Sequence, residues 1–199
     1  GPGSSLEAAQ IAAKSYINAV APTDYIEIIA YDNEVKVYSE FTNNKSYLTS
    51  VIDGIVSGGA TASYDAVVKA AEDLGARGGR KVVILLTDGD DNSSSNSETA
   101  CINKVNSKGV ACFTIGVGSG VSMTILQNIA NGTGGRSYSS LTGDLSALFQ
   151  EILYQLNNQV EIGFRTRMGE KSKDDNTRKL TIYLNYAPFS KYFEKIYGY

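Results

Sequence analysis

The sequence predicts an α/β fold with a doubly wound, mostly parallel sheet, followed by a small antiparallel β appendage. Strand-like segments alternate with amphipathic helical segments between residues 6 and 156. The segment from Arg80 to Thr87 is apolar over nearly its whole length, as expected for a central strand covered on both faces. After residue 158 the pattern changes, because strand-like segments follow one another with no helix between them.

The predicted helices share an apolar spacing of three or four residues, and they cover 6–20, 45–56, 63–76, 98–107, 122–131 and 145–156. The predicted strands are short and rich in β-branched residues, and they cover 24–31, 35–38, 80–87, 110–117 and 136–139. Pro22 ends the first helix, Gly109 ends the fourth, and Ser122 is the expected N-cap of the fifth. The spacing of these elements favours strands that run parallel.

The chain is expected to contain one α/β domain, residues 5–158, and one β appendage, residues 159–199. Residues 1–4 read Gly-Pro-Gly-Ser and are interpreted as the remnant of a cleaved expression tag. The appendage is predicted to hold strands at 160–167, 179–186 and 192–197, with a charged and polar linker before the second.

Composition excludes several function classes. The chain has 199 residues and a formal net charge of −3, so a general nucleic-acid binder is not expected. Its longest apolar run, near residues 82–86, is far too short to insert into a membrane. The absence of histidine removes Ser-His-Asp and Cys-His catalysis, and we predict that the protein is not an enzyme. Any bound metal would be held by oxygen, which favours Mg²⁺, Ca²⁺ or Mn²⁺.

Two polar loops should meet where the strands end, which is where doubly wound sheets bind ligands. The first is the glycine-rich segment 58–66, GGATASYDA, which contains Thr61. The second follows the predicted central strand, over residues 84–92, ILLTDGDDN, and contains Asp88. A hydroxyl and a carboxylate at adjacent strand ends can hold a hard cation directly or through water.

These motifs, with Thr-Ile-Gly-Val-Gly at 114–118, resemble the von Willebrand factor type A domain over residues 6–156. The resemblance implies a metal-ion-dependent adhesion site with Thr61 and Asp88 as ligands, completed by an acidic residue of a protein partner. It also implies a protein-binding module of an adhesion or assembly protein, located outside the cell or on its surface. Asp90, Asp91 and Asn92 are interpreted mainly as solvated loop residues, in a position where a ligand could contact them.

The sequence departs from the family in one respect, because the first strand and its Asp-x-Ser-x-Ser loop have no counterpart before Ser5. That strand is central, so its absence should leave two rows of backbone groups unpaired. A second polypeptide or swapped copy, the C-terminal tail, or residues outside the given sequence could fill the position. The alternative function is therefore a metal-independent interaction module completed by a partner strand. In this fragment alone, the divalent cation could be absent.

Cys101 and Cys112 are expected to face each other across a helix–sheet interface. A disulfide and two buried free thiols are both compatible with that placement.

Overall fold

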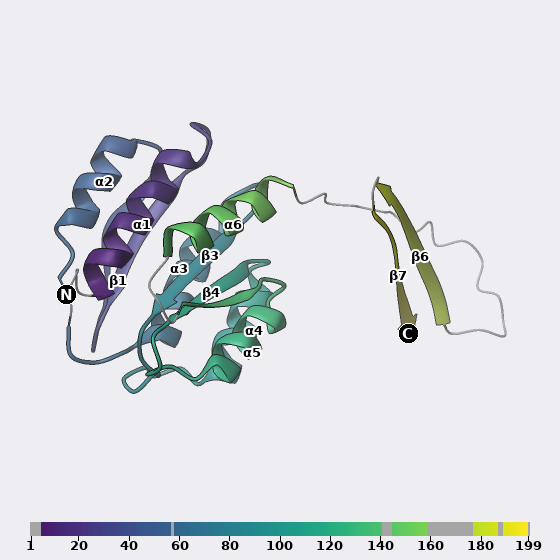
Figure 1. The fold of residues 1–199 in the computed structure, drawn as a ribbon. Coiled ribbons are helices and arrows are strands. Elements are labelled where there is room, and N and C mark those ends of the chain that lie inside the picture. The colour runs from purple at the N-terminus through teal and green to yellow at the C-terminus, as the bar shows by residue number, and fades with distance from the viewer. Residues whose placement is uncertain (1–4, 57, 141–144, 159–176, 187–188, 199) are drawn as a thin grey trace. The chain divides into compact units, whose positions relative to one another are not determined.

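A computed structural model describes residues 5–56, 58–140, 145–158, 177–186 and 189–198 of the chain. The chain divides into two compact units, residues 1–159 and 160–199, and each is described by itself (Figure 1).

The first unit contains the alternating helices and strands that the sequence predicts, and the α/β fold class is confirmed. Its helices are α1 (Ser5–Ala19), α2 (Lys45–Asp53), α3 (Ser63–Gly75), α4 (Glu98–Ser107), α5 (Met123–Gly132) and α6 (Leu145–Asn157). Its strands are β1 (Ile26–Tyr31), β2 (Val35–Thr42), β3 (Val82–Thr87), β4 (Ala111–Val117) and β5 (Ser137–Ser140). The strand β2 is longer than predicted, because residues up to Thr42 pair with β1.

The strands form two groups. β3, β4 and β5 make a parallel sheet in that order, and β1 pairs with β2 in an antiparallel ladder. β4 is the most enclosed strand, with Cys112, Phe113 and Ile115 each 1 % exposed or less. Helices α3, α4 and α5 cover one face of β3 and β4, and α1 and α6 cover the other.

No backbone hydrogen bond joins β1 to β3 in the described residues, so the two groups remain separate sheets. Helix α3 nevertheless packs against both β1 and β3. Each of these strands begins near the last turn of α3 and ends near the first turn of α3. At the last turn, burial and then the neighbouring Asp73 raise the pKa of Glu27, near the start of β1, to about 7. β1 and β3 therefore run parallel under one helix with an interruption between them.

The hydroxyl of Tyr31 crosses this interruption. It lies at the end of β1 and donates a hydrogen bond of 2.6 Å to the carbonyl of Leu86 in β3. Adjacent strands are about 4.8 Å apart, so an omitted strand separates its neighbours by about 9.6 Å, a distance suited to a tyrosine side chain. Burial raises the pKa of Tyr31 far above its usual value, so the hydroxyl stays protonated and donates.

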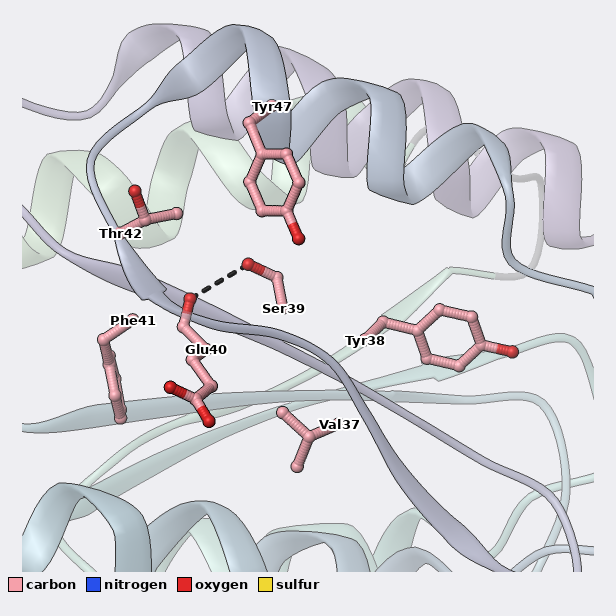
Figure 2. A pocket seen from close by; sticks show the side chains of 7 residues that line it. All are labelled: Val37, Tyr38, Ser39, Glu40, Phe41, Thr42 and Tyr47. Atoms are coloured by element: carbon pink, nitrogen blue, oxygen red, sulfur yellow. Dashed lines mark hydrogen bonds between the residues drawn. The ribbon is translucent and has the colours of Figure 1, made fainter.

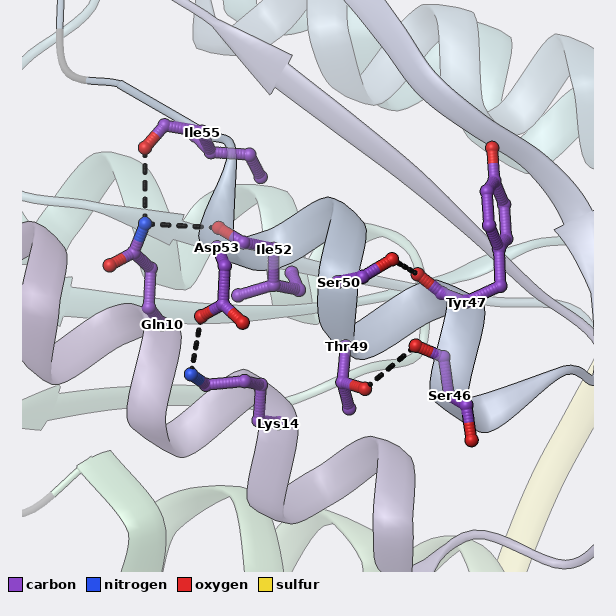
Figure 3. A network of polar contacts seen from close by, with 9 residues as sticks. All are labelled: Gln10, Lys14, Ser46, Tyr47, Thr49, Ser50, Ile52, Asp53 and Ile55. Atoms are coloured by element: carbon purple, nitrogen blue, oxygen red, sulfur yellow. Dashed lines mark hydrogen bonds and ion pairs between the residues drawn. The ribbon is translucent and has the colours of Figure 1, made fainter.

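On the opposite face, α1 connects the two groups. It packs against α6 and the β4 core, and it also packs against α2 and Ile28 of β1. Figure 3 shows how α1 holds α2: Gln10 donates to the carbonyls of Ile52 and Ile55, both at 3.0 Å, and Lys14 pairs with Asp53 at 2.5 Å. The domain therefore stays together through its helices where its sheet is interrupted.

The second unit is an antiparallel hairpin of β6 (Thr177–Tyr186) and β7 (Phe189–Gly198). The pairing runs in unbroken register from Thr177 opposite Gly198 to Tyr186 opposite Phe189. The predicted strands at 179–186 and 192–197 are present and longer than expected. The predicted strand at 160–167 lies outside the described residues.

Gly135, just before β5, sits unusually close to β4. A Cβ built on this residue would lie 2.0 Å from the carbonyl oxygen of Cys112 and 2.5 Å from its carbonyl carbon. These are backbone atoms of a buried strand, so they have little room to yield. Only glycine fits at this position.

Candidate functional site

The loops that follow β1 and β3 meet at the start of α3. The carbonyl of Asp32, directly after β1, accepts a hydrogen bond of 2.8 Å from the amide of Ala62. Gly58 lies against the same aspartate, since a Cβ there would approach the Asp32 carboxylate to 2.5 Å. The glycine-rich loop is thereby fixed at the carboxyl ends of the strands.

The segment after β3 holds Thr61 in a closed set of hydrogen bonds. The Thr61 amide donates to Oδ1 of Asn92 at 3.0 Å, and its carbonyl accepts from the amides of Asn92 and Ser93 at 2.9 and 3.2 Å. Its hydroxyl oxygen lies 3.5 Å from where a Cβ of Gly89 would stand, beside Asp88. The structure therefore places the two sequence-predicted ligand residues, Thr61 and Asp88, at the same end of the sheet.

Asp91 is the centre of a second set of contacts, which the sequence did not predict. Its Oδ2 accepts from the Ser63 hydroxyl (3.0 Å), the Tyr64 amide (2.9 Å) and the Ser94 hydroxyl (2.7 Å), and Oδ1 accepts from the Ser94 amide (3.1 Å). Burial alone would raise the pKa of Asp91, but hydrogen bonds from Ser94, Tyr64 and Ser63 hold it below its ordinary value. The interpretation of Asp91 as a solvated loop charge is wrong.

These contacts cap α3 from a distant part of the chain. The N-cap position is Ala62, whose side chain has no acceptor for the first amides of the helix. Asp91 accepts from Tyr64, and the Ser94 hydroxyl accepts from the amide of Asp65 at 3.0 Å. An alanine at an N-cap was the one signal in the sequence that an acceptor must come from elsewhere.

Asp65, in the first turn of α3, also binds the loop that follows β3. Its carboxylate accepts from the amides of Ser95 and Asn96 at 2.8 and 2.9 Å, and from the Asn96 side-chain amide at 2.7 Å. Burial would raise the pKa of Asp65, but these hydrogen bonds lower it. Residues 91–96 and the first turn of α3 are thus joined by hydrogen bonds in both directions.

Asp90 and Ser122 connect two loops at this end of the sheet. Asp90 is exposed, and its Oδ1 accepts from the backbone amide of Ser122 at 2.5 Å. Ser122 occupies the N-cap position of α5 as predicted, but its side chain makes no capping hydrogen bond. Asp90 therefore ties the loop after β3 to the loop after β4, and Asn92 is exposed beside it.

The side-chain oxygens at this end of the sheet are of the type that binds a hard divalent cation, but they are too few to fill its coordination shell. Thr61 is half-buried and Asp88 is exposed, and both offer oxygen. Mg²⁺ and Ca²⁺ need six or more oxygens, and the described residues contain no group of three or more acidic, histidine or cysteine side chains able to hold a metal. Water, a partner carboxylate or another segment must supply the remaining ligands.

Cys101 in α4 and Cys112 in β4 are free thiols, and both are completely buried in the core. Burial raises the pKa of the Cys101 thiol to about 12 and that of Cys112 still further. Both thiols therefore act as small apolar side chains in the core.

The sequence model of the von Willebrand factor type A domain matches residues 4–154. The chain belongs to this family. Members of the family are protein-interaction modules, and the motifs that carried the resemblance lie on the strand ends described above. A comparison with curated proteins gave no match.

Solved structures share the fold at low sequence identity. An aerotolerance-related membrane protein from Bacteroides fragilis is 15% identical with a TM-score of 0.67, and the alignment covers 77% of this chain and 89% of that one. The von Willebrand factor domain of the type V pili tip protein Mfa5 from Porphyromonas gingivalis is 13% identical with a TM-score of 0.64, covering 81% and 91%. Proximal thread matrix protein 1 from the mussel byssus, with a zinc-occupied MIDAS motif, is 22% identical with a TM-score of 0.63, covering 75% and 42%.

In the described part of this chain, no helix combines the length and the apolar character needed to cross a membrane.

Proposed function

We propose that this von Willebrand factor type A domain binds a protein partner at the carboxyl end of its sheet, through a divalent cation held by Thr61 and Asp88. The observation that carries the proposal is the placement of Thr61 and Asp88 at the carboxyl end of the sheet, where the Thr61 hydroxyl oxygen lies 3.5 Å from the position of a Cβ on Gly89, the residue after Asp88. Asp88 is exposed there, in a segment whose following residues are held by the hydrogen bonds of Asp91 and Asp65. A cell-surface or adhesion role fits the pili-tip and membrane-protein structures that share the fold.

The cation would act as a Lewis acid that attracts an acidic side chain of the partner. The chain's own residues do the positioning. The bonds from Asn92 and Ser93 fix the Thr61 backbone, so the backbone that carries its hydroxyl needs no reorganisation on binding. Asp90 holds the loop before α5 close to the same surface and adds negative charge at its rim.

The test is binding of Mn²⁺ alone, followed by calorimetry and electron paramagnetic resonance on the whole chain. We expect weak binding, with a dissociation constant of about 10⁻⁴ to 10⁻³ M, because few protein oxygens contribute. Asp88→Ala should weaken it at least about tenfold, and Thr61→Val, which keeps the shape, should weaken it less. Asp90→Ala removes the same charge two residues away without removing a proposed ligand, so it should weaken Mn²⁺ binding less than Asp88→Ala does. Equal Mn²⁺ affinity for the wild type and Asp88→Ala would rule out this site.

A second candidate function is supported by the interruption between β1 and β3. We propose that the interval accepts an extended strand from a partner, which would complete the sheet without metal. The Tyr31 hydroxyl now satisfies one β3 carbonyl there, that of Leu86, and an inserted strand would replace it with backbone amides. Helices cover both faces, so the occupant must be apolar on both sides.

Hydrogen exchange tests this function, with a six-residue valine and isoleucine peptide flanked by lysines as the probe. We expect exchange to slow in β1 and β3 together, and not in β5. A peptide of the same composition with a central proline should have no effect, because it cannot complete a ladder. The function is ruled out if β1 and β3 amides are equally protected with and without the probe.

A further inference from the structure

Four basic side chains gather at the amino end of the parallel sheet, the end opposite the proposed metal site. Arg77, Arg80 and Lys81 lie between α3 and β3, and Lys108 directly follows α4. The ammonium of Lys81 donates to the carbonyls of Gly75 and Lys108, at 3.2 and 3.3 Å, so the ends of α3 and α4 meet the start of β3 here. We call Arg77, Arg80, Lys81 and Lys108 the basic end.

Within the described residues, no ion pair neutralises the positive charge of the basic end. The ion pairs of the first unit use other cations, and on α3 the carboxylates of Glu72 and Asp73 engage Lys104 and Lys69. Asp24, just before β1, is an exposed carboxylate at the same end. The basic end therefore carries an excess of positive charge on a chain whose formal net charge is −3.

Two of these cations also contact helix ends, a role that basic residues commonly have at such positions. Lys81 bonds the carbonyls named above, and the guanidinium of Arg80 donates to the carbonyl of Leu156 in the last turn of α6. An ammonium has three donors and a guanidinium has five, so these contacts leave further donors available. Arg77, Arg80 and Lys108 are exposed, so the basic end can bind an anion from solution.

The shape of the basic end suits a broad partner rather than a small ligand. Residues 76–80 are all exposed, and no heavy atom lies within 4 Å of a Cβ built on Gly78 or Gly79. An open groove of about 500 Å³ lies along β2, lined by residues 37–42 and Tyr47, and none of the four basic residues lines it (Figure 2). A projecting basic loop can meet a flat anionic surface without a groove.

An exposed tyrosine lies beside the basic end. Tyr25 is 56 % exposed, and its ring centre lies 5.7 Å from the guanidinium of Arg77, which lies 4.1 Å from the ring centre of Phe41. Tyrosine is enriched where a bilayer meets water, because its ring is apolar and its hydroxyl is polar, and neighbouring basic residues attract anionic headgroups. This pair favours a lipid surface over a soluble polyanion, to which a tyrosine ring adds little.

We propose that the basic end docks this domain on the surface of a bilayer that contains anionic lipids, without insertion. The lipid phosphates would contact Arg77, Arg80 and Lys108, and the ring of Tyr25 would lie among the headgroups. The proposed metal site lies at the other end of the sheet, so docking would present that site away from the bilayer. The inference does not depend on the metal site and goes beyond the proposed function.

The test is co-sedimentation of the whole chain with vesicles of phosphatidylcholine that contain about one third phosphatidylglycerol. The wild type should be half bound at about 1 mM lipid in about 0.1 M salt, the affinity expected of four basic residues near an anionic surface. It should not bind vesicles of phosphatidylcholine alone. Binding should be lost in roughly 1 M salt, where charge interactions are screened.

Charge variants locate the contact. Lys108→Gln should weaken binding about fivefold, and the double variant Arg80→Gln, Lys108→Gln about 25-fold. Lys36→Gln is the matched control, because Lys36 is also exposed and without an ion pair in the described residues, but it lies opposite Ala30 near the carboxyl end of β1. It should change binding less than about twofold. Asp24→Asn removes a negative charge at the basic end and should strengthen binding.

Dextran sulfate, a soluble polyanion, separates the lipid surface from other anions. Tyr25→Ala leaves every charge in place, so it should weaken binding to vesicles and not to dextran sulfate. Equal vesicle binding by Tyr25→Ala and the wild type overturns the choice of a bilayer. A wild type that does not bind the anionic vesicles, or a Lys108→Gln that binds as well as Lys36→Gln, overturns the proposal. Residues 159–199 are the same in every variant, and thermal melts should show all variants folded.

Discussion

Replacing Asp91 with alanine is expected to reduce the free energy of unfolding by about 2–3 kcal/mol, although the residue is not a proposed metal ligand. The substitution removes an ionised acceptor that binds the Ser63 and Ser94 hydroxyls and two backbone amides. The amide of Tyr64 would lose its partner at a helix start where Ala62 offers none. Urea unfolding of the whole chain, followed by circular dichroism, measures the loss.

Asp88→Ala is the matched control, and it should cost less than about 1 kcal/mol, because Asp88 is exposed. The difference between Asp91→Ala and the wild type should also depend on pH. The pKa of Asp91 is lowered in the folded state, so its contribution is complete above the unfolded value of about 3.9 and is lost as the pH falls through the folded value. A loss in Asp91→Ala no larger than that in Asp88→Ala would contradict the capping role.

Gly135→Ala is expected to destabilise the domain by about 3 kcal/mol or more. The added methyl group would have to overlap the Cys112 carbonyl, 2.0 Å away, or separate β5 from β4. Separation would break the ladder that pairs Thr114 with Ser137 and Ile115 with Tyr138. The variant should unfold at lower temperature in calorimetry, and loss of amide protection should be greatest in β5.

Gly78→Ala provides the comparison for this prediction. No heavy atom lies within 4 Å of a Cβ at Gly78, so that substitution should change the free energy of unfolding by less than about 1 kcal/mol. If the two alanine variants unfold at similar temperatures, β5 tolerates more movement than the close approach indicates.

The alternation of apolar segments predicted the elements of the first unit well, because buried strands and amphipathic helices leave local signals. The apolar run that forms β3, and the glycine stop after α4, are such signals. β2 was underestimated because its second half, from Ser39 to Thr42, is held by pairing with β1 rather than by its own composition. Ladder partners are distant in sequence, and no local pattern encodes them.

In the candidate site, too, local sequence signals could be predicted and contacts between distant residues could not. The placement of Thr61 and Asp88 at one end of the sheet could be predicted because each lies in a short motif at a strand end, and their role as ligands stays a prediction. The role of Asp91 could not be, since its partners Ser63 and Tyr64 are 28 and 27 residues away. Its sequence neighbourhood, three acidic residues around a glycine, resembles a solvated turn. The interruption beside β1 was anticipated, but the reach of Tyr31 to Leu86 depends on a tertiary distance.

The remote cap on α3 has a consequence for engineering the recognition surface. A designer who wished to change specificity would graft the loop after β3 from another family member onto this scaffold. The residues that the graft must retain are Asp91 and Ser94, whose oxygens receive the first amides of α3. A loop chosen only for its outward-facing side chains would unravel the helix beneath it. If the proposed function holds, positions 90 and 92 are the ones to vary, because 88 belongs to the proposed metal site and 91 and 94 belong to the scaffold.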